Sequence, residues 1–202
     1  LTPNPTTPYP QPRLADEVST DPVPMTTAIK AIARTVVLGN PGGGKTTLAH
    51  KLVHLLTTCP DDPHIAGRRL TPLFVTLRDY AEAKRRDDLS VIQFIAARCN
   101  AELQLPVEPE VIEYLLRTGR ALAIFDGLDE LLDTGRRREI SNTIETFATR
   151  FPDAPMLVTS REVGYDQAPL DEQRFRVWRV APFDEAQSRD YARKWFAADP
   201  DL

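Results

Sequence analysis

A glycine-rich loop between an apolar segment and an amphipathic one constrains the fold more than any other feature of this sequence. The loop covers residues 39–47 and follows residues 34–38, a short β-branched run that is typical of a buried parallel strand. After the loop, apolar residues recur at helical spacing through residues 48–56. A strand, a glycine-rich loop and a helix in this order gather several backbone N–H groups around one point, where they can bind a phosphate. The sequence therefore predicts a phosphate-binding loop.

The loop contains each kind of residue that binding a nucleoside triphosphate requires. Three consecutive glycines leave room for the backbone to wrap the phosphates. Lys45 can reach the outer phosphates as a point charge, and the Thr46 hydroxyl is placed to ligate Mg²⁺. The predicted nucleotide-binding residues of the loop are Gly39, Pro41, Gly42, Gly43, Gly44, Lys45, Thr46 and Thr47.

Three acids follow an uninterrupted apolar segment. Residues 121–125 have the character of a central parallel strand, and they lead directly into Asp126. Ligand sites in open α/β sheets lie outside the carboxyl ends of the strands, where the glycine loop is also expected. We therefore expect Asp126 to hold Mg²⁺ opposite Thr46, rather than only to cap the next helix. Asp129 and Glu130 can orient or deprotonate a water at the terminal phosphate, and the sequence leaves open which of them does so.

Arg161 and a run of three consecutive arginines give two further predictions. Arg161 follows a predicted strand at residues 156–159, so we expect it to sense the terminal phosphate, although a strand-end arginine on its own would be a surface residue. Arg136, Arg137 and Arg138 begin a predicted helix, where a basic triplet opposes the helix dipole. We expect a solvated face there, with an arginine finger for a neighbouring subunit as the alternative.

Two more candidates are predicted to flank the nucleotide base. Arg13 lies in residues 1–24, whose many prolines forbid regular helix, and this segment is either a linker or folds back beside the base. Pro182 follows a predicted strand at residues 175–180 and can press against the base.

The remaining elements follow from periodicity. Ser90 is predicted to cap a helix that buries Val91, Phe94, Ile95 and Leu103. A second strand is expected at residues 72–77, and the charge run after it is interpreted as a solvated face or a loop. The other predicted helices cover residues 26–33, 45–58, 110–118, 136–147 and 184–196.

Composition excludes several classes of protein. A net charge of −4 and a pI near 5.5 argue against a dominant nucleic-acid-binding surface. Cys59 and Cys99 lack metal or redox spacing, and His50 and His54 lack a third ligand. No apolar run approaches the roughly 18 to 20 residues of a membrane span, so we expect a cytoplasmic protein. Because the chain begins without Met, we also expect it to be part of a longer protein.

The motifs resemble those of the NACHT domain in the STAND class of P-loop signalling NTPases. The resemblance rests on the glycine loop, on Asp126 followed by a small residue and then by acids three and four places on, and on the sequence Thr159-Ser160-Arg161. It extends over roughly residues 9–198 and implies a three-layer α/β P-loop domain with a five-stranded parallel sheet of order 5-1-4-3-2. The expected division is a Pro-rich linker or nucleotide-flanking segment at 1–24, the NACHT domain at 25–182 and the start of a helical subdomain at 183–202.

The resemblance also implies a function. Such domains bind ATP or ADP with Mg²⁺, hydrolyse ATP slowly and switch from a closed ADP-bound monomer to an open ATP-bound oligomer, between an effector and a sensor in one longer chain. Many act in innate immunity, including antiviral defence in bacteria. The winged-helix subdomain, whose histidine usually touches the diphosphate in this family, is missing from the sequence. A non-hydrolysing nucleotide-binding scaffold and an AAA-type motor are the alternatives, and the motor would require pore elements and an arginine finger that the sequence does not identify.

Overall fold

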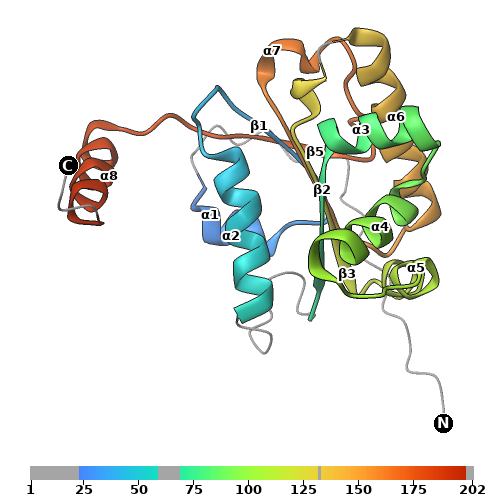
Figure 1. The fold of residues 1–202 in the computed structure, drawn as a ribbon. Helices are drawn as coiled ribbons and strands as arrows, with labels where there is room; N and C mark the ends of the chain where they lie inside the picture. The colour runs from blue at the N-terminus through green and yellow to red at the C-terminus, as the bar shows by residue number, and fades with distance from the viewer. Residues whose placement is uncertain (1–22, 59–68, 132, 199–202) are drawn as a thin grey trace.

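The chain folds into a parallel sheet with helices on both faces (Figure 1). A computed structural model of the 202-residue chain describes residues 23–58, 69–131 and 133–198. The strand order is β2-β3-β4-β1-β5, and every neighbouring pair is parallel. The predicted order 5-1-4-3-2 is therefore confirmed. The strands are β1 (Arg34–Leu38), β2 (Thr71–Thr76), β3 (Ala121–Asp126), β4 (Met156–Ser160) and β5 (Arg176–Arg179).

Helices form the two outer layers. On one face, α1 and α2 cover the sheet, and the larger group α3 to α6 covers the other (Figure 1). The long helix α8 stands apart from both layers, and every residue in it whose burial is described is exposed. The helices are α1 (Met25–Lys30), α2 (Lys45–Thr58), α3 (Leu77–Asp87), α4 (Val91–Leu103), α5 (Pro109–Arg117), the 3-10 turn η1 (Leu128–Glu130), α6 (Thr134–Arg150), α7 (Glu162–Tyr165) and α8 (Glu185–Ala198).

Strand β3 separates two hydrophobic cores. Leu122 and Ile124 pack into the core beneath α1 and α2, and Phe125 packs into the core beneath α3 to α6. All six β3 residues are buried, as expected for a strand with helices on both faces. Phe125 meets Phe147 of α6 edge to face, with ring centroids 5.5 Å apart. The apolar run at residues 121–125 therefore forms the predicted central strand. Its packing on both faces determines where the strand ends and the acids begin.

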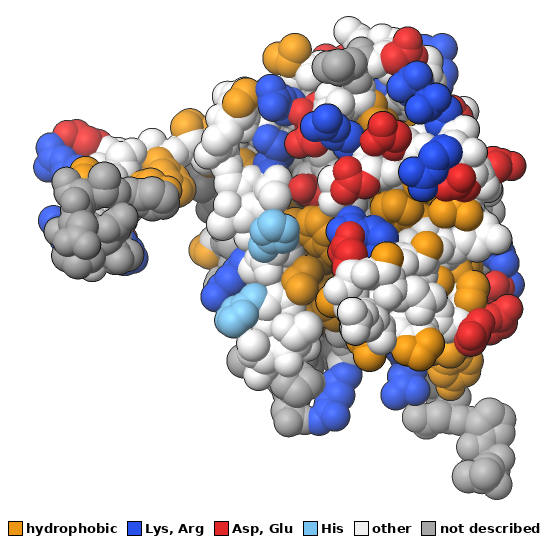
Figure 2. Space-filling model, viewed as in Figure 1, with side chains coloured by type: hydrophobic (Ala, Val, Ile, Leu, Met, Phe, Trp, Pro, Cys, Tyr) orange, Lys and Arg blue, Asp and Glu red, His pale blue; other side chains and the backbone are white. Residues whose placement is uncertain are grey.

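Helix α3 corrects the prediction for the second strand. The strand was expected to continue through Leu77, but β2 ends at Thr76 and α3 begins at the next residue. Leu77 and Tyr80 are buried at helical spacing, and this packing extends the helix through the charge run. The loop alternative is wrong for residues 84–87, which are helical, while Asp88 is the first residue beyond the helix. The solvated-face alternative holds, since acidic and basic side chains intermingle over α3 and α6 (Figure 2).

Two further predictions about individual side chains are wrong. Leu103 was expected to face inward, but it is 64% exposed because α4 ends there, beyond the reach of the core. The arginine triplet was expected to be solvated, but Arg137 is buried. Arg136 and Arg138 are exposed as expected. Helix α6 tolerates the basic triplet because the Asp133 side chain caps it, accepting a hydrogen bond from the Arg136 N–H at 2.9 Å.

Thr159 joins the carboxyl ends of β3 and β4. Its buried hydroxyl donates a hydrogen bond to Asp126 Oδ1 at 2.6 Å and accepts one from the Gly127 N–H at 2.9 Å. Both partners are buried, so neither can turn to water if the hydroxyl is lost. One side chain thus adds a link between the ends of two strands that already pair in the sheet.

Replacing Thr159 with Val keeps the shape of the side chain and removes the hydroxyl. We expect the free energy of unfolding to fall by about 1–3 kcal/mol because a buried N–H loses its acceptor and a buried carboxylate loses a donor. Urea denaturation followed by circular dichroism measures this change. Thr159→Ser keeps the hydroxyl and is the control; equal losses in the two variants would show that packing, not hydrogen bonding, matters at this position.

Candidate functional site

The glycine loop lies at the carboxyl edge of the sheet, between β1 and α2. The Gly39 N–H donates to Ser160 O at 3.2 Å, which anchors the start of the loop to β4, and the Gly43 N–H donates to Asn40 O at 3.0 Å. Gly42 and Gly44 have φ angles of +75° and +83°, and a Cβ atom on either would meet nothing within 4 Å. The loop thus opens away from the protein at the first turn of α2, in a backbone conformation that favours glycine.

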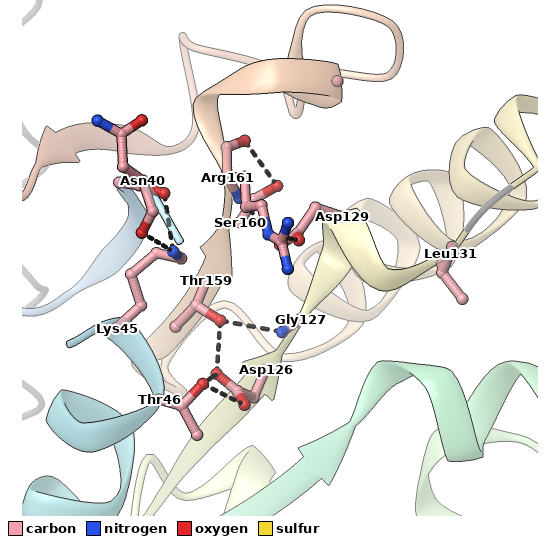
Figure 3. A network of polar contacts seen from close by, with 12 residues as sticks. Asn40, Lys45, Thr46, Asp126, Gly127, Asp129, Leu131, Thr159, Ser160 and Arg161 are labelled. Atoms are coloured by element: carbon pink, nitrogen blue, oxygen red, sulfur yellow. Dashed lines mark hydrogen bonds and ion pairs between the residues drawn. The ribbon is translucent and has the colours of Figure 1, made fainter. Parts of the chain in front are cut away.

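Lys45 carries a positive charge at the opening of this loop. Its ammonium group donates hydrogen bonds to Gly39 O at 2.7 Å and to Asn40 O at 3.0 Å (Figure 3). Both acceptors belong to the loop itself. The side chain is therefore held against the backbone that would wrap a phosphate, and its charge adds to the positive end of the α2 dipole.

Asp126 is the centre of a polar network that links three elements. Thr46 from α2 donates its hydroxyl proton toward the carboxylate, with oxygen distances of 3.1 Å to Oδ2 and 3.4 Å to Oδ1. Thr159 from β4 holds Oδ1 from the other side (Figure 3). Asp126 is only 6% exposed. A hydroxyl and a carboxylate side by side form the hard oxygen donor set that Mg²⁺ prefers, so these residues fit the predicted metal.

Asp129 and Arg161 form a second pair beside this network. Asp129 Oδ1 accepts a hydrogen bond from the Arg161 N–H at 2.9 Å, and the guanidinium Nε lies 2.8 Å from Oδ2 (Figure 3). The Asp129 side chain is 9% exposed and the Arg161 side chain 48%. Both Asp129 oxygens are therefore engaged. The Glu130 side chain is exposed and makes no hydrogen bond or ion pair with the described residues.

The structure brings most of the predicted site residues together at one edge of the sheet. Pro41 and Thr47 are exposed residues of the loop and of the first turn of α2. Pro182 is exposed on the segment between β5 and α8, which passes the loop because the Val180 N–H donates to Leu38 O at 2.8 Å. Arg13 lies outside the described residues, and its place beside the base stays a prediction.

The role of Thr159 in the polar network was not predicted. The residue is part of the Thr159-Ser160-Arg161 motif, and in the structure its hydroxyl holds Asp126 in place. A polar residue at the end of an otherwise apolar strand is the signal that could have identified it. The partner could not have been identified, because the register of β3 against β4 decides which side chains meet.

Two other features bear on function classes. Within residues 23–58, 69–131 and 133–198, no group of three or more His, Cys, Asp or Glu side chains could hold a metal ion. His50, which the sequence pairs with His54, instead lies against the Phe74 ring, with centroids 5.1 Å apart. None of the helices in the same ranges combines the length and the apolar character that crossing a membrane requires.

Solved structures share the fold at low sequence identity. The Aeropyrum pernix Orc1 protein, solved in complex with DNA, is 17% identical with a TM-score of 0.51, over 80% of this chain and 43% of that chain. Domain III of the Thermotoga maritima replication initiation protein DnaA is 16% identical with a TM-score of 0.50, over 87% of this chain and 65% of that one. These likenesses concern the fold alone.

Sequence comparison identifies a family. An uncharacterized WD repeat-containing protein of Nostoc sp. is 30% identical over 135 residues, which are 65% of this chain and 8% of that protein. The chain thus spans only a small part of that relative. The NACHT domain matches residues 33–199, from the start of β1 through the end of α8. With this match over most of its length and the P-loop NTPase fold described above, the chain belongs to the NACHT domain family.

Proposed function

We propose that this domain binds ATP and ADP with Mg²⁺, hydrolyses ATP slowly and acts as a nucleotide-dependent switch of conformation and oligomerisation. One observation carries the proposal. The Thr46 hydroxyl, in the first turn of the helix after the glycine loop, lies 3.1 Å from the buried Asp126 carboxylate at the end of β3. Membership of the NACHT family supports nucleotide binding and NTPase activity in general. The finer statements depend on the residues named below.

The loop and Asp126 divide the binding of the phosphates and the metal. Lys45 and the backbone from Gly39 to Gly44 bind the phosphates, and the Thr46 hydroxyl and the Asp126 carboxylate hold the metal. When bound, Mg²⁺ neutralises charge on the outer phosphates. Thr159 holds Oδ1 at 2.6 Å, so we assign Oδ2, whose hydrogen bond from Thr46 is longer at 3.1 Å, as the oxygen that would ligate the ion.

The two acids after Asp126 have different roles. Each Asp129 oxygen already accepts from Arg161, one from the backbone N–H and one from the guanidinium, so Asp129 is committed to holding Arg161. The Glu130 side chain is exposed beside Gly127 and makes no hydrogen bond or ion pair with the described residues. We therefore assign Glu130 as the general base, and Asp129 as the residue that positions Arg161.

Arg161 is the residue that distinguishes ATP from ADP in this proposal. Its side chain is about half exposed and comes from the end of β4, next to the strand that leads into the loop. A guanidinium can exchange a carboxylate for a phosphate oxygen, because its fork of donors fits both groups. Occupancy by a triphosphate then moves Arg161, which makes the bound nucleotide a signal as well as a substrate.

The setting of the domain is inferred from its family and its relative. We propose effector and sensor segments in the same longer protein, self-association of the NTPase domain in the ATP state, and a role in innate immune or antiviral signalling. A relative that is named for WD repeats supports a repeat-type sensor. Bound DNA belongs to the Orc1 structure and, with a net charge of −4 here, nucleic acid is not proposed as a partner. The cytoplasmic location and the division at residues 24 and 182 stay predictions, as does contact of Pro182 and Arg13 with the base.

Lys45→Ala tests the binding step. We expect the affinity for ATP and ADP to fall by at least about 100-fold, because the cation that faces the phosphates is lost, and this corresponds to about 2.7 kcal/mol. Titration of a fluorescent ADP analogue measures the affinity. Lys51→Ala, at an exposed position of the same helix, is the matched control and should bind as the wild type does. Unchanged affinity in Lys45→Ala would contradict nucleotide binding at this loop.

Glu130→Gln tests the hydrolytic step. We expect nucleotide affinity to stay within about twofold and hydrolysis to slow by about 100-fold or more, because the general base is removed. Phosphate release over several hours, with Mg²⁺ present, is the measurement, and Glu82→Gln at an exposed position of α3 is the control. Unaltered turnover would transfer the role to Asp129. A wild type that releases no phosphate would favour the non-hydrolysing scaffold.

A further inference from the structure

Arg137 is a buried cation that the proposed chemistry does not use. Its side chain leaves the first turns of α6, and the residue is only 7% exposed. One terminal guanidinium nitrogen, Nη1, donates to Gly164 O at 2.8 Å and to the Gln167 side chain at 3.3 Å. The other, Nη2, donates to Leu131 O at 2.8 Å and to Asp129 O at 3.4 Å. Among the described residues, Arg137 has carbonyl and amide acceptors but no carboxylate partner.

These acceptors belong to two segments that are far apart in the sequence. The first is the acid loop, residues 128–131, which is separated from Asp126 by Gly127 alone. The second is the post-β4 segment, residues 161–168, which begins with Arg161. Both segments leave the carboxyl edge of the sheet, one from β3 and one from β4. Arg137 binds them together behind the site.

Contacts that begin at Arg137 pass through Asp129, Arg161 and Gly164 and end again at Arg137. Its carbonyl group accepts from Arg137, and its carboxylate accepts from the backbone and side chain of Arg161. Gly164 follows Arg161 closely in the chain, and its carbonyl group accepts a hydrogen bond from Arg137. Asp129 is therefore held on both sides, by α6 and by the end of β4, and Glu130 follows it in the same turn.

Other residues on the same face of α6 strengthen the attachment. The Thr134 hydroxyl donates to the Gln167 side chain at 3.1 Å, and the Ser141 hydroxyl donates to Ala168 O at 2.9 Å. Residues 134, 137 and 141 recur at helical spacing, so they form one stripe along the helix. The stripe fixes the post-β4 segment to α6, while only Arg137 in it also contacts the acid loop.

Gly164 lies close to the guanidinium group and has no side chain to obstruct it. Its φ is +95°, and a Cβ atom built on it would lie 2.7 Å from Nη1 of Arg137. Any side chain at this position would therefore strain the backbone and displace the guanidinium. The post-β4 segment contains a glycine where Arg137 approaches most closely.

We propose that Arg137 is a positioning residue that holds Asp129, and with it Glu130, in a fixed relation to Arg161. The planar fork of an arginine can donate to two backbone segments at once, which the single ammonium of a lysine does less well. The inference rests on the function proposed above for these three residues. It adds that α6 couples the acid that activates water to the arginine that senses the terminal phosphate, so that movement of one is transmitted to the other.

Arg137→Met tests the coupling, because it keeps a long apolar stem and removes the donors. We expect faster amide hydrogen exchange in residues 127–131 and in residues 161–168, with exchange in α2 unchanged. Affinity for the fluorescent ADP analogue should stay within about threefold, since no phosphate ligand changes, and kcat should fall by at least about tenfold with little change in KM. Gly164→Ala should reproduce this pattern with Arg137 still present.

Two variants make the result interpretable. Arg138→Met is the matched control: it lies next to Arg137, is exposed and, within the described part of the chain, donates one hydrogen bond, of 3.5 Å, to Gln167 O. It should behave as the wild type does. Arg137→Lys, which keeps the charge, should show an intermediate effect and serves if Arg137→Met does not fold. Unchanged exchange in residues 127–131 in both Arg137 variants would overturn the proposal, as would an unchanged kcat with altered exchange. Exchange is measured without nucleotide, so a failure of the proposed ATPase function would be seen separately.

Discussion

The site depends on one buried carboxylate and the two hydroxyl groups that hold it. Burying an ionised carboxylate is costly unless hydrogen-bond donors replace water, and Asp126 obtains them from Thr46 and Thr159. These donors come from the helix after the glycine loop and from the neighbouring strand. The same contacts that make the buried charge tolerable therefore fix the loop, β3 and β4 relative to one another.

The two sides of the site differ in how firmly they are held. On the metal side, Asp126 is buried and its partners are short side chains with few rotamers. On the other side, Arg161 is a long side chain that is about half exposed and paired with Asp129. Because the guanidinium half of the pair is accessible to solvent, a phosphate oxygen can reach it, although the Asp129 carboxylate itself is nearly buried. This arrangement suits a domain in which the phosphates and the metal bind to firmly held residues. Arg161, which is held less firmly, then responds to whether the nucleotide is ATP or ADP. Arg137 anchors the backbone on the Arg161 side of the site, because it attaches both the acid loop and the post-β4 segment to α6.

Local sequence patterns were enough to predict the glycine loop and the position of Asp126. The order of apolar strand, glycines and amphipathic helix, and the apolar run that ends in Asp126, each depend on neighbours along the chain. What could not be predicted depends on contacts across the chain. Helix α3 exists because Leu77 and Tyr80 pack against the core, although the residues around them are highly charged. The difference between Asp129 and Glu130 follows from a partner 32 residues away. Burial of Arg137 depends on backbone carbonyl groups that no side-chain pattern reveals.

The magnesium dependence of binding tests the central claim most directly, that Thr46 and Asp126 form a metal site beside the glycine loop. Calorimetric titration of a non-hydrolysable ATP analogue would be carried out with Mg²⁺ and with a chelator, for the wild type and for Asp126→Asn. In the wild type, we expect removal of Mg²⁺ to weaken binding by about tenfold or more, and in Asp126→Asn this difference should shrink to about twofold or less. Equal magnesium dependence in the two proteins, or none in the wild type, would contradict the assignment of the metal site.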